Sequence, residues 1–240
     1  LTDFKDVYTR WDKNFAEKGW NTVYLGNHDQ PRMVTRWGND SPEFREISSK
    51  MLSTFLLTQR ATPYYFQGDE LGMSNIKFDK IEDYRDIETI NWYKQVKAEG
   101  GDVQQLLDSH KISARDNSRT PIQWDNTANG GFTTGTPWLK VNQNHQTINA
   151  AAQEKDENST LNYFRKLTEL RKKELTLVYG KYVVVDEKNE NVYAYTRELN
   201  GKKLLILLNF TDKEATVNTG IEMKQAKFVL GNYAESSKDG

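Results

Sequence analysis

The sequence predicts an α/β protein with parallel strands, followed by a smaller antiparallel β-domain. Over the first 70 residues, the apolar pattern alternates in the order helix, strand, helix, strand, which is typical of parallel sheets. From Tyr179 onward, apolar residues recur at every second position, as in antiparallel strands. We place the boundary after residue 175, which gives domains of residues 1–175 and 176–240.

The first predicted element is an amphipathic helix over Leu1–Lys18, with Thr2 or Asp3 as its N-cap and Gly19 as its C-cap. Its apolar residues recur at helical spacing: Phe4, Val7, Tyr8, Trp11 and Phe15. A short strand follows over Asn21–Gly26. It is apolar on both faces, which suits a buried parallel sheet.

A second helix is predicted to begin at Ser41, with Pro42 at the first helical position. Its apolar face comprises Phe44, Ile47, Met51, Leu52 and Phe55. A second buried strand is predicted over Thr62–Gly68. Because α/β proteins bind ligands at the carboxyl ends of their strands, the polar residues after both strands are candidates for function.

A long polar stretch extends from Met73 to Asp156 and contains one weak helical segment near Ile87–Leu107. Connections of this length are uncommon in compact domains and are often functional. Another helix is predicted from Leu161 to Leu170, with Asn158 or Ser159 as its N-cap.

The C-terminal part is expected to form an antiparallel β-sandwich. Its predicted strands are "KYVVVD", "NVYAYTREL", "KKLLILLNF" and "QAKFVLGNY". Turns are expected at Lys188–Asn191 and at Asn200–Gly201, where Asn-Gly is a strong hairpin signal.

Composition excludes several classes of protein. The net charge is −1 without a basic stripe, so nothing favours a nucleic-acid partner. No apolar run approaches the length of a membrane span, and no signal peptide is evident. The chain has no cysteine, no metal-ligand spacing and no nucleotide-binding fingerprint, so we expect no metal and no cofactor. We expect a cytoplasmic protein, and the start at Leu1 instead of Met suggests a piece of a longer one.

His28 and Asp29 lie just after the first strand and could carry chemistry. They could equally form a strand-end turn in which Asn27 and Asp29 bond to nearby backbone and His28 is packed. Asp69 and Glu70 follow the second strand. They could be an acid/base pair, but adjacent residues of an extended segment point to opposite sides, which favours a structural role.

A third cluster, Arg115, Asp116 and Arg119, lies in the polar stretch. Arginine offers a rigid fork of donors suited to carboxylates or vicinal hydroxyls. The alternative is a solvated run of charges with a local Asp116–Arg119 ion pair. The two remaining histidines, His110 and His145, stand in polar surroundings and are expected on the surface.

Four segments taken together resemble the α-amylase superfamily of glycoside hydrolases (family 13), specifically its oligo-1,6-glucosidase and α-glucosidase branch. They are "LGNHDQPRMVTRWGND", "YYFQGDELGM", "YRDIETINWY" and "RDNSRTPIQWD". The resemblance covers nearly the whole chain. It implies that residues 1–175 are the C-terminal part of a (β/α)₈ TIM barrel, with Asn21–Gly26 as strand 7 and Thr62–Gly68 as strand 8.

The resemblance also implies roles for single residues. Asp29 matches the family's transition-state-stabilising aspartate, and His28 matches its partner in binding sugar hydroxyls. Arg119 matches an arginine that holds the non-reducing glucose in the −1 subsite, and Arg115 a residue near the +1 subsite. The nucleophile and the acid/base residue would lie outside this chain. We therefore expect the fragment to be inactive alone and to associate through exposed barrel edges.

The implied function is hydrolysis of α-1,6 or α-1,4 glucosidic bonds in short oligosaccharides by an exo-acting, retaining enzyme. Trehalose-6-phosphate hydrolase, maltase and sucrose isomerase of the same branch are alternatives. A non-catalytic, glycosidase-like partner domain is another, although such domains typically lose the motifs that are present here. A further possibility is that only the β-domain is stable.

Overall fold

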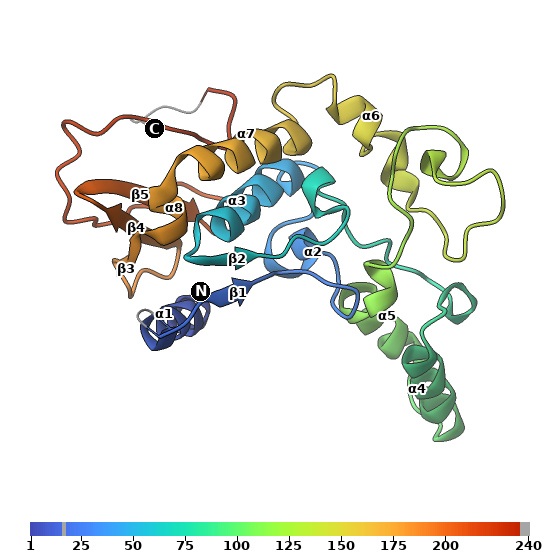
Figure 1. Cartoon of the computed structure of the whole chain (residues 1–240). Coiled ribbons are helices and arrows are strands. Elements are labelled where there is room, and N and C mark those ends of the chain that lie inside the picture. Colours follow the sequence, from blue (N-terminus) through green and yellow to red (C-terminus); the bar gives the residue numbers. More distant parts are fainter. Residues whose placement is uncertain (16–17, 236–240) are drawn as a thin grey trace. The chain divides into compact units, whose positions relative to one another are not determined.

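The computed structural model describes residues 1–15 and 18–235 (Figure 1). The chain divides into two compact units. Unit 1 comprises Leu1–Tyr24, Lys50–Tyr64 and Tyr163–Gly240, and unit 2 comprises Leu25–Ser49 and Tyr65–Asn162. The predicted domain boundary after residue 175 stays a prediction.

A parallel strand pair lies in unit 1. Strand β1 (Asn21–Val23) pairs with β2 (Ala61–Pro63), with Asn21 opposite Ala61. The parallel pairing is confirmed, but both strands are shorter than predicted. The last bond of the ladder runs from the Tyr64 N–H to the Val23 carbonyl (2.8 Å). Beyond it the chain enters polar loops, so the apolar residues that follow are not strand.

Helix α1 (Thr2–Phe15) has the predicted amphipathic character. The ring of Phe4 packs against those of Tyr8 and Phe55, at centroid distances of 4.9 and 5.0 Å. Thr2 is already the first helical residue, so the predicted N-cap at Thr2 or Asp3 is wrong. The predicted extension toward Lys18 crosses residues 16–17, which lie outside the described residues.

Helix α3 (Arg45–Thr58) begins three residues after Pro42, so the predicted start at Pro42 is wrong. Instead, the Ser41 carbonyl accepts the N–H groups of Phe44 (3.2 Å) and Arg45 (2.9 Å) in a turn that leads into the helix. The predicted apolar face is correct in its central part. Leu52 and Phe55 are fully buried.

Helices α7 (Thr160–Lys173) and α8 (Leu175–Tyr179) precede the C-terminal sheet. The Ser159 hydroxyl accepts the Asn162 N–H (3.2 Å), which confirms Ser159 as the N-cap of α7. The two buried arginines Arg171 and Arg197 bind carbonyl groups in this region. Arg171 Nη1 donates to the carbonyls of Leu57 (2.7 Å) and Leu177 (3.0 Å), so its charge is compensated by backbone dipoles at helix ends.

The C-terminal sheet has the predicted hairpins. Strands β3 (Lys181–Val185), β4 (Val192–Leu199) and β5 (Lys202–Asn209) pair antiparallel in that order (Figure 1). Asn200 and Gly201 both have positive φ (51° and 79°), the conformation that a two-residue hairpin needs. The side chains of Tyr193 and Tyr195 are fully buried on β4.

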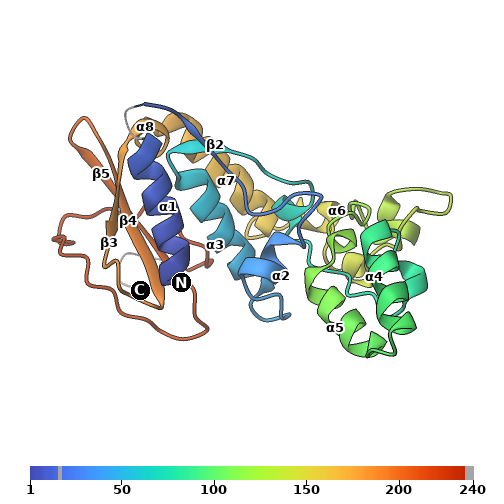
Figure 2. The same ribbon diagram turned by 90° about the horizontal axis from the view of Figure 1, so that it is seen from below.

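The predicted strand over Gln225–Tyr233 is wrong, because no strand follows Asn209 in the described part of the chain. A sandwich would need a second sheet, and the described residues 176–235 form only the three-stranded one. Helix α1 lies beside this sheet (Figure 2), with the Thr9 hydroxyl 3.4 Å from that of Tyr182 and Phe4 edge-on to Tyr193. A helix therefore covers a face on which a second sheet would pack.

Unit 2 holds helices α2 (Met33–Trp37), α4 (Ile87–Ala98), α5 (Val103–Ser113) and α6 (Ala150–Gln153), connected by loops and short 3₁₀ turns. The single weak helix predicted near Ile87–Leu107 is in fact two helices, α4 and α5, which lie side by side (Figure 2). Gly100, at φ 72°, ends the first, and the Asp102 carboxylate caps the second by accepting the Gln104 N–H (2.9 Å).

A small apolar core stabilises this part of unit 2. It comprises Phe78, Tyr84, Leu107, Ala114 and Leu139. His110 and His145, predicted on the surface, are both buried. Each ring places Nδ1 beside a backbone carbonyl, of Leu106 (2.8 Å) and Asn142 (2.9 Å) respectively. Both are packed core histidines, which hydropathy alone does not reveal.

Residues 1–15 and 18–235 contain no helix that is both long and apolar enough to cross a membrane. The same residues contain no group of three or more histidine, aspartate or glutamate side chains arranged to hold a metal ion.

Candidate active site

Asp29 lies in the loop that follows β1, within unit 2. Asn27 Oδ1 accepts the Asp29 N–H (2.8 Å), which is the local turn that the structural interpretation expects. The same interpretation expects a packed histidine, but the His28 side chain is 71% exposed. Its Nε2 lies 3.3 Å from Asp29 Oδ2. The turn therefore orients the two side chains instead of burying them.

Two arginines from the long polar stretch converge on Asp29. Arg119 Nη2 donates to Asp29 Oδ1 (2.9 Å), and Arg119 Nε donates to the His28 carbonyl (2.7 Å). Arg115 Nη1 lies 3.5 Å from the same Asp29 oxygen. The four residues that sequence reasoning selected thus lie together, although the arginines are separated from Asp29 by about 90 positions along the chain.

Asp86 is a member of this cluster that was missed from the sequence. Arg115 binds it through two parallel hydrogen bonds, Nε to Oδ2 (2.9 Å) and Nη2 to Oδ1 (2.8 Å). Burial alone would raise the pKa of Asp86, but the hydrogen bonds and charge of Arg115 outweigh it and hold the pKa below its usual range. The segment "YRDIETINWY" contained Asp86, but a lone aspartate before a helix reads first as a cap.

The geometry limits the chemistry that each carboxylate can perform. A general acid needs a raised pKa and a proton to give, whereas Asp86 is held ionised with both oxygens bound to Arg115. Asp86 is therefore no proton donor. Asp29 is half exposed, and its Oδ1 is held by the arginines. Such a fixed, outward carboxylate next to guanidinium donors suits hydrogen bonding to a polyhydroxylated ligand.

Asp69 and Glu70 hold the loop structure. Asp69 is 2% exposed, and one of its oxygens occupies the space that a Cβ at Gly26 would need. Glu70 Oε2 accepts the Gly68 N–H (2.8 Å) within its own turn. Burial raises the pKa of Asp69 to about 7, against the opposing charge of Arg32 and with a further upward contribution from Glu70. These contacts favour the structural interpretation over an acid/base pair.

Replacement of Asp69 by Asn is expected to change how stability depends on pH. A carboxyl group whose pKa is raised in the folded state stabilises the fold below its unfolded pKa near 4, and this stabilisation is lost as pH rises through about 7. In thermal unfolding of the protein between pH 5 and pH 8, the Tm of Asp69→Asn minus that of the wild type should therefore increase as pH rises. Asp156→Asn, at an exposed position, is the control. A difference between Asp69→Asn and wild type that does not vary with pH would contradict the assignment.

A buried arginine connects the loops that carry the cluster. Arg32, 1% exposed, donates from Nη1 to the Gln67 carbonyl (2.6 Å), and its Nη2 lies 3.4 Å from the Thr120 carbonyl. Its backbone N–H donates to Asn75 Oδ1 (2.9 Å). Burial lowers the pKa of Arg32 to about 10. The loop after β1 and the segment after Arg119 are thereby fixed to a common support.

Comparison with known protein families gives a match over most of the chain. The family model described as "Alpha amylase, catalytic domain" matches residues 1–180, and the one described as "Maltogenic Amylase, C-terminal domain" matches residues 182–235. The chain belongs to the alpha-amylase family. The resemblance noted in the sequence is confirmed, and the chain combines part of an alpha-amylase TIM barrel with a C-terminal antiparallel sheet. The assignment of β1 and β2 to barrel strands 7 and 8 stays a prediction.

Several known proteins are similar to the chain. An oligo-1,6-glucosidase from Parageobacillus thermoglucosidasius is 45% identical over 236 residues, which are 97% of this chain and 42% of that protein. A trehalose-6-phosphate hydrolase from Bacillus subtilis is 43% identical over 212 residues, covering 88% of this chain and 38% of that one. The crystal structure of isomaltulose synthase from Erwinia rhapontici matches with a TM-score of 0.85 and 44% identity, over 89% of this chain and 38% of that one. The chain thus spans less than half the length of these relatives.

Proposed function

We propose that this chain is part of a retaining, exo-acting α-glucosidase that hydrolyses α-1,6 or α-1,4 glucosidic bonds in short oligosaccharides. The observation that carries the proposal is the convergence of Arg115 and Arg119 on one oxygen of Asp29. Oligo-1,6-glucosidases among the relatives support the reaction class. The cytoplasmic location expected from the sequence stays a prediction.

In this proposal, Asp29 stabilises the transition state. A hydrogen bond between a carboxylate and a hydroxyl of the −1 glucose becomes stronger as positive charge develops on the sugar ring. His28 contributes a second contact to the same sugar, and its exposed imidazole next to Asp29 Oδ2 is compatible with that role. Arg119 holds the non-reducing end of the glucose, and Arg115 lies toward the +1 side.

A retaining glycosidase also needs a nucleophilic carboxylate and an acid/base carboxyl group, about 5 Å apart. We propose that both belong to parts of the enzyme outside this chain. Asp86 cannot replace the acid because Arg115 occupies both of its oxygens. The chain by itself is therefore expected to be inactive and to associate through the edges of its barrel strands.

Two alternative activities are suggested by particular relatives. The Bacillus subtilis relative is named a trehalose-6-phosphate hydrolase, and the Erwinia rhapontici relative is named an isomaltulose synthase. We rank both below oligosaccharide hydrolysis because four oligo-1,6-glucosidases match the chain at 42–45% identity over nearly its whole length.

Substrate profiling of the full-length enzyme that contains this chain tests the proposal. Isomaltose, maltose, trehalose 6-phosphate and sucrose would be supplied at equal concentration, and products followed by chromatography. We expect glucose release from isomaltose or maltose at the highest kcat/KM. Preference for trehalose 6-phosphate, or conversion of sucrose to an isomer, would replace the proposed activity with one of the alternatives. The 240-residue chain alone serves as the control and should release no glucose.

A further inference from the structure

We propose that Asp116 is a positioning residue that fixes the Arg115–Asp86 pair and, through its negative charge, the guanidinium group of Arg119. This inference rests on the proposed function, because it concerns how the same site is held in its working geometry. Asp116 does not touch Asp29 or His28 through any contact found among the described residues, so it acts through the two arginines.

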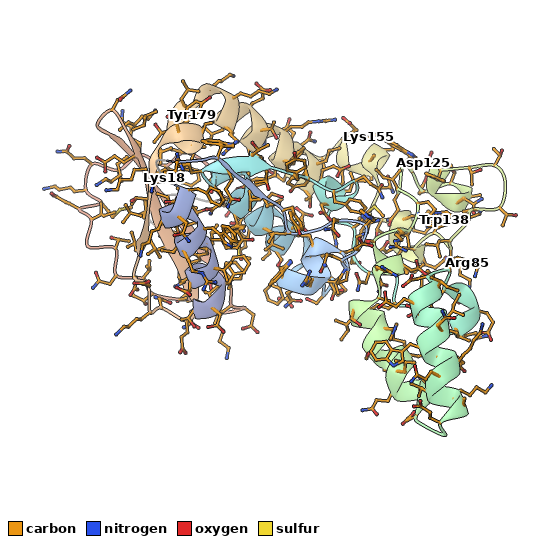
Figure 3. The ribbon with its side chains drawn as sticks, turned by 60° about the horizontal axis from the view of Figure 1, so that its bottom comes forward. Lys18, Arg85, Asp125, Trp138, Lys155 and Tyr179 are labelled. Atoms are coloured by element: carbon orange, nitrogen blue, oxygen red, sulfur yellow. The ribbon has the colours of Figure 1, made fainter. Side chains whose placement is uncertain are left out.

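The first step is the burial of Asp116. Its side chain is completely inaccessible to solvent. Oδ2 accepts two backbone N–H groups, those of Arg85 and Asp86, each at 2.7 Å. Arg85 and Asp86 directly precede α4, where backbone N–H groups have no partner within the helix and favour a negative charge. Arg85 is labelled in Figure 3. Asp116 therefore anchors the start of α4.

The second step follows from the position of Asp116 in the chain. Arg115 precedes Asp116 in the 3₁₀ turn Arg115–Asn117. Both residues bind Asp86: Arg115 binds its carboxylate, and Asp116 binds its backbone N–H. Residues 85–86 and 115–116 thus hold each other by two separate connections. Asn117 braces the same turn, because its Nδ2 donates to the carbonyl of Ala114 (2.9 Å) and its Oδ1 accepts the Lys77 N–H (3.1 Å).

The third step concerns the other oxygen of Asp116. Oδ1 is buried and has no hydrogen-bond partner among residues 1–15 and 18–235. The cation found near it is Arg119 Nη1, at 3.7 Å, which is too far for a hydrogen bond but close enough for charge attraction. Arg119 Nη1 also lies 3.9 Å from Asp86 Oδ1. Two carboxylates therefore attract this end of the guanidinium group, while Asp29 binds the other end.

The two functions of Asp116 can be separated by substitution. Accepting two N–H groups needs an oxygen of the right position, which asparagine also supplies. Attracting Arg119 needs the negative charge, which asparagine lacks and glutamate retains. Asparagine would also place either its oxygen or its amide nitrogen toward Arg119, with no net charge in either case. A purely structural Asp116 thus predicts that Asn is the better replacement, and a positioning Asp116 predicts that Glu is.

The experiment measures kcat and KM of the full-length enzyme on p-nitrophenyl α-glucoside, normalised to folded protein by circular dichroism. We expect Asp116→Asn to lower kcat/KM by about 10–100-fold and Asp116→Glu to lower it less. We also expect Asp116→Asn to have little further effect in an Arg119→Lys background, because both changes disturb the same contact. Asn149→Ala, a buried side chain that caps α6 and binds the His145 carbonyl, is the matched control and should stay within about twofold of wild type.

Three results would overturn the inference. The first is a kcat/KM of Asp116→Asn within about twofold of wild type, and the second is a higher kcat/KM for Asp116→Asn than for Asp116→Glu. The third is a double variant whose loss in kcat/KM equals the product of the losses of Asp116→Asn and Arg119→Lys. The comparison of Glu with Asn still decides the matter if one of them folds in low yield, because activity is expressed per folded molecule. Absence of turnover by the wild type would overturn the proposed function and this inference with it.

Discussion

Replacement of Asp29 by Asn is expected to lower kcat/KM of the full-length enzyme on an α-glucoside by about 10²–10³-fold, the range seen when one preorganised transition-state contact is removed. The change preserves shape but removes the charge that binds Arg119 and that, in the proposed function, faces the reacting sugar. Because the interaction strengthens in the transition state, we expect the larger part of the loss in kcat and the smaller part in KM.

Asp108→Asn is the control for this experiment. Asp108 is an exposed carboxylate on α5 in the same unit and binds Lys111 and Gln104. It should leave kcat/KM unchanged within about twofold. Retention of wild-type kcat by Asp29→Asn, with only KM raised, would mean that Asp29 binds substrate and transition state equally, and the proposed role would be wrong.

Replacement of Arg197 by Met is expected to destabilise the protein by about 3 kcal/mol or more, since several buried carbonyl groups lose their donor at once. Arg197 is fully buried on β4. It donates to the carbonyls of Leu177 (2.8 Å) and Gly180 (2.8 Å), and also to that of Thr58 at the end of α3. Burial lowers the pKa of Arg197 to about 10, so the side chain remains charged at neutral pH.

The measurement for Arg197 is thermal or urea unfolding of the full-length protein. Arg10→Met, at an exposed position of α1, is the matched control and should change stability by no more than about 0.5 kcal/mol. If Arg197→Met unfolds at the same temperature as Arg10→Met, the hydrogen bonds between Arg197 and the carbonyl groups do not contribute the expected stability.

Much of the fold could be predicted from local patterns. The hairpin around Asn200–Gly201 carries a turn signal, and both the antiparallel pairing of β4 with β5 and the positive φ of Asn200 and Gly201 are observed. The strand predicted over Gln225–Tyr233 is not observed, although its pattern of apolar residues is similar. Alternation of apolar and polar residues indicates that a segment can be buried on one face. A strand also needs the edge of a neighbouring strand to pair with, and the tertiary structure decides whether that edge is present.

The site was predicted in part for a similar reason. His28, Asp29, Arg115 and Arg119 stood in recognisable motifs, and the structure brings them together. The roles of Asp86 and Asp116 cannot be predicted from local sequence, because they depend on which groups these carboxylates bind across some 30 positions of chain. A carboxylate that binds backbone and a carboxylate in a solvated charge run have the same sequence signature. Only the contacts distinguish them.

The central claim is that Asp29 and Arg119 bind one and the same glucose ring. A crystal structure of the full-length enzyme with glucose bound tests it directly, as has been done for an isomaltulose synthase variant in complex with D-glucose. We predict that the Asp29 carboxylate and the Arg119 guanidinium group will each lie within hydrogen-bond distance of hydroxyls on the same sugar. A glucose bound in the enzyme's catalytic pocket without contact to either residue would contradict the account.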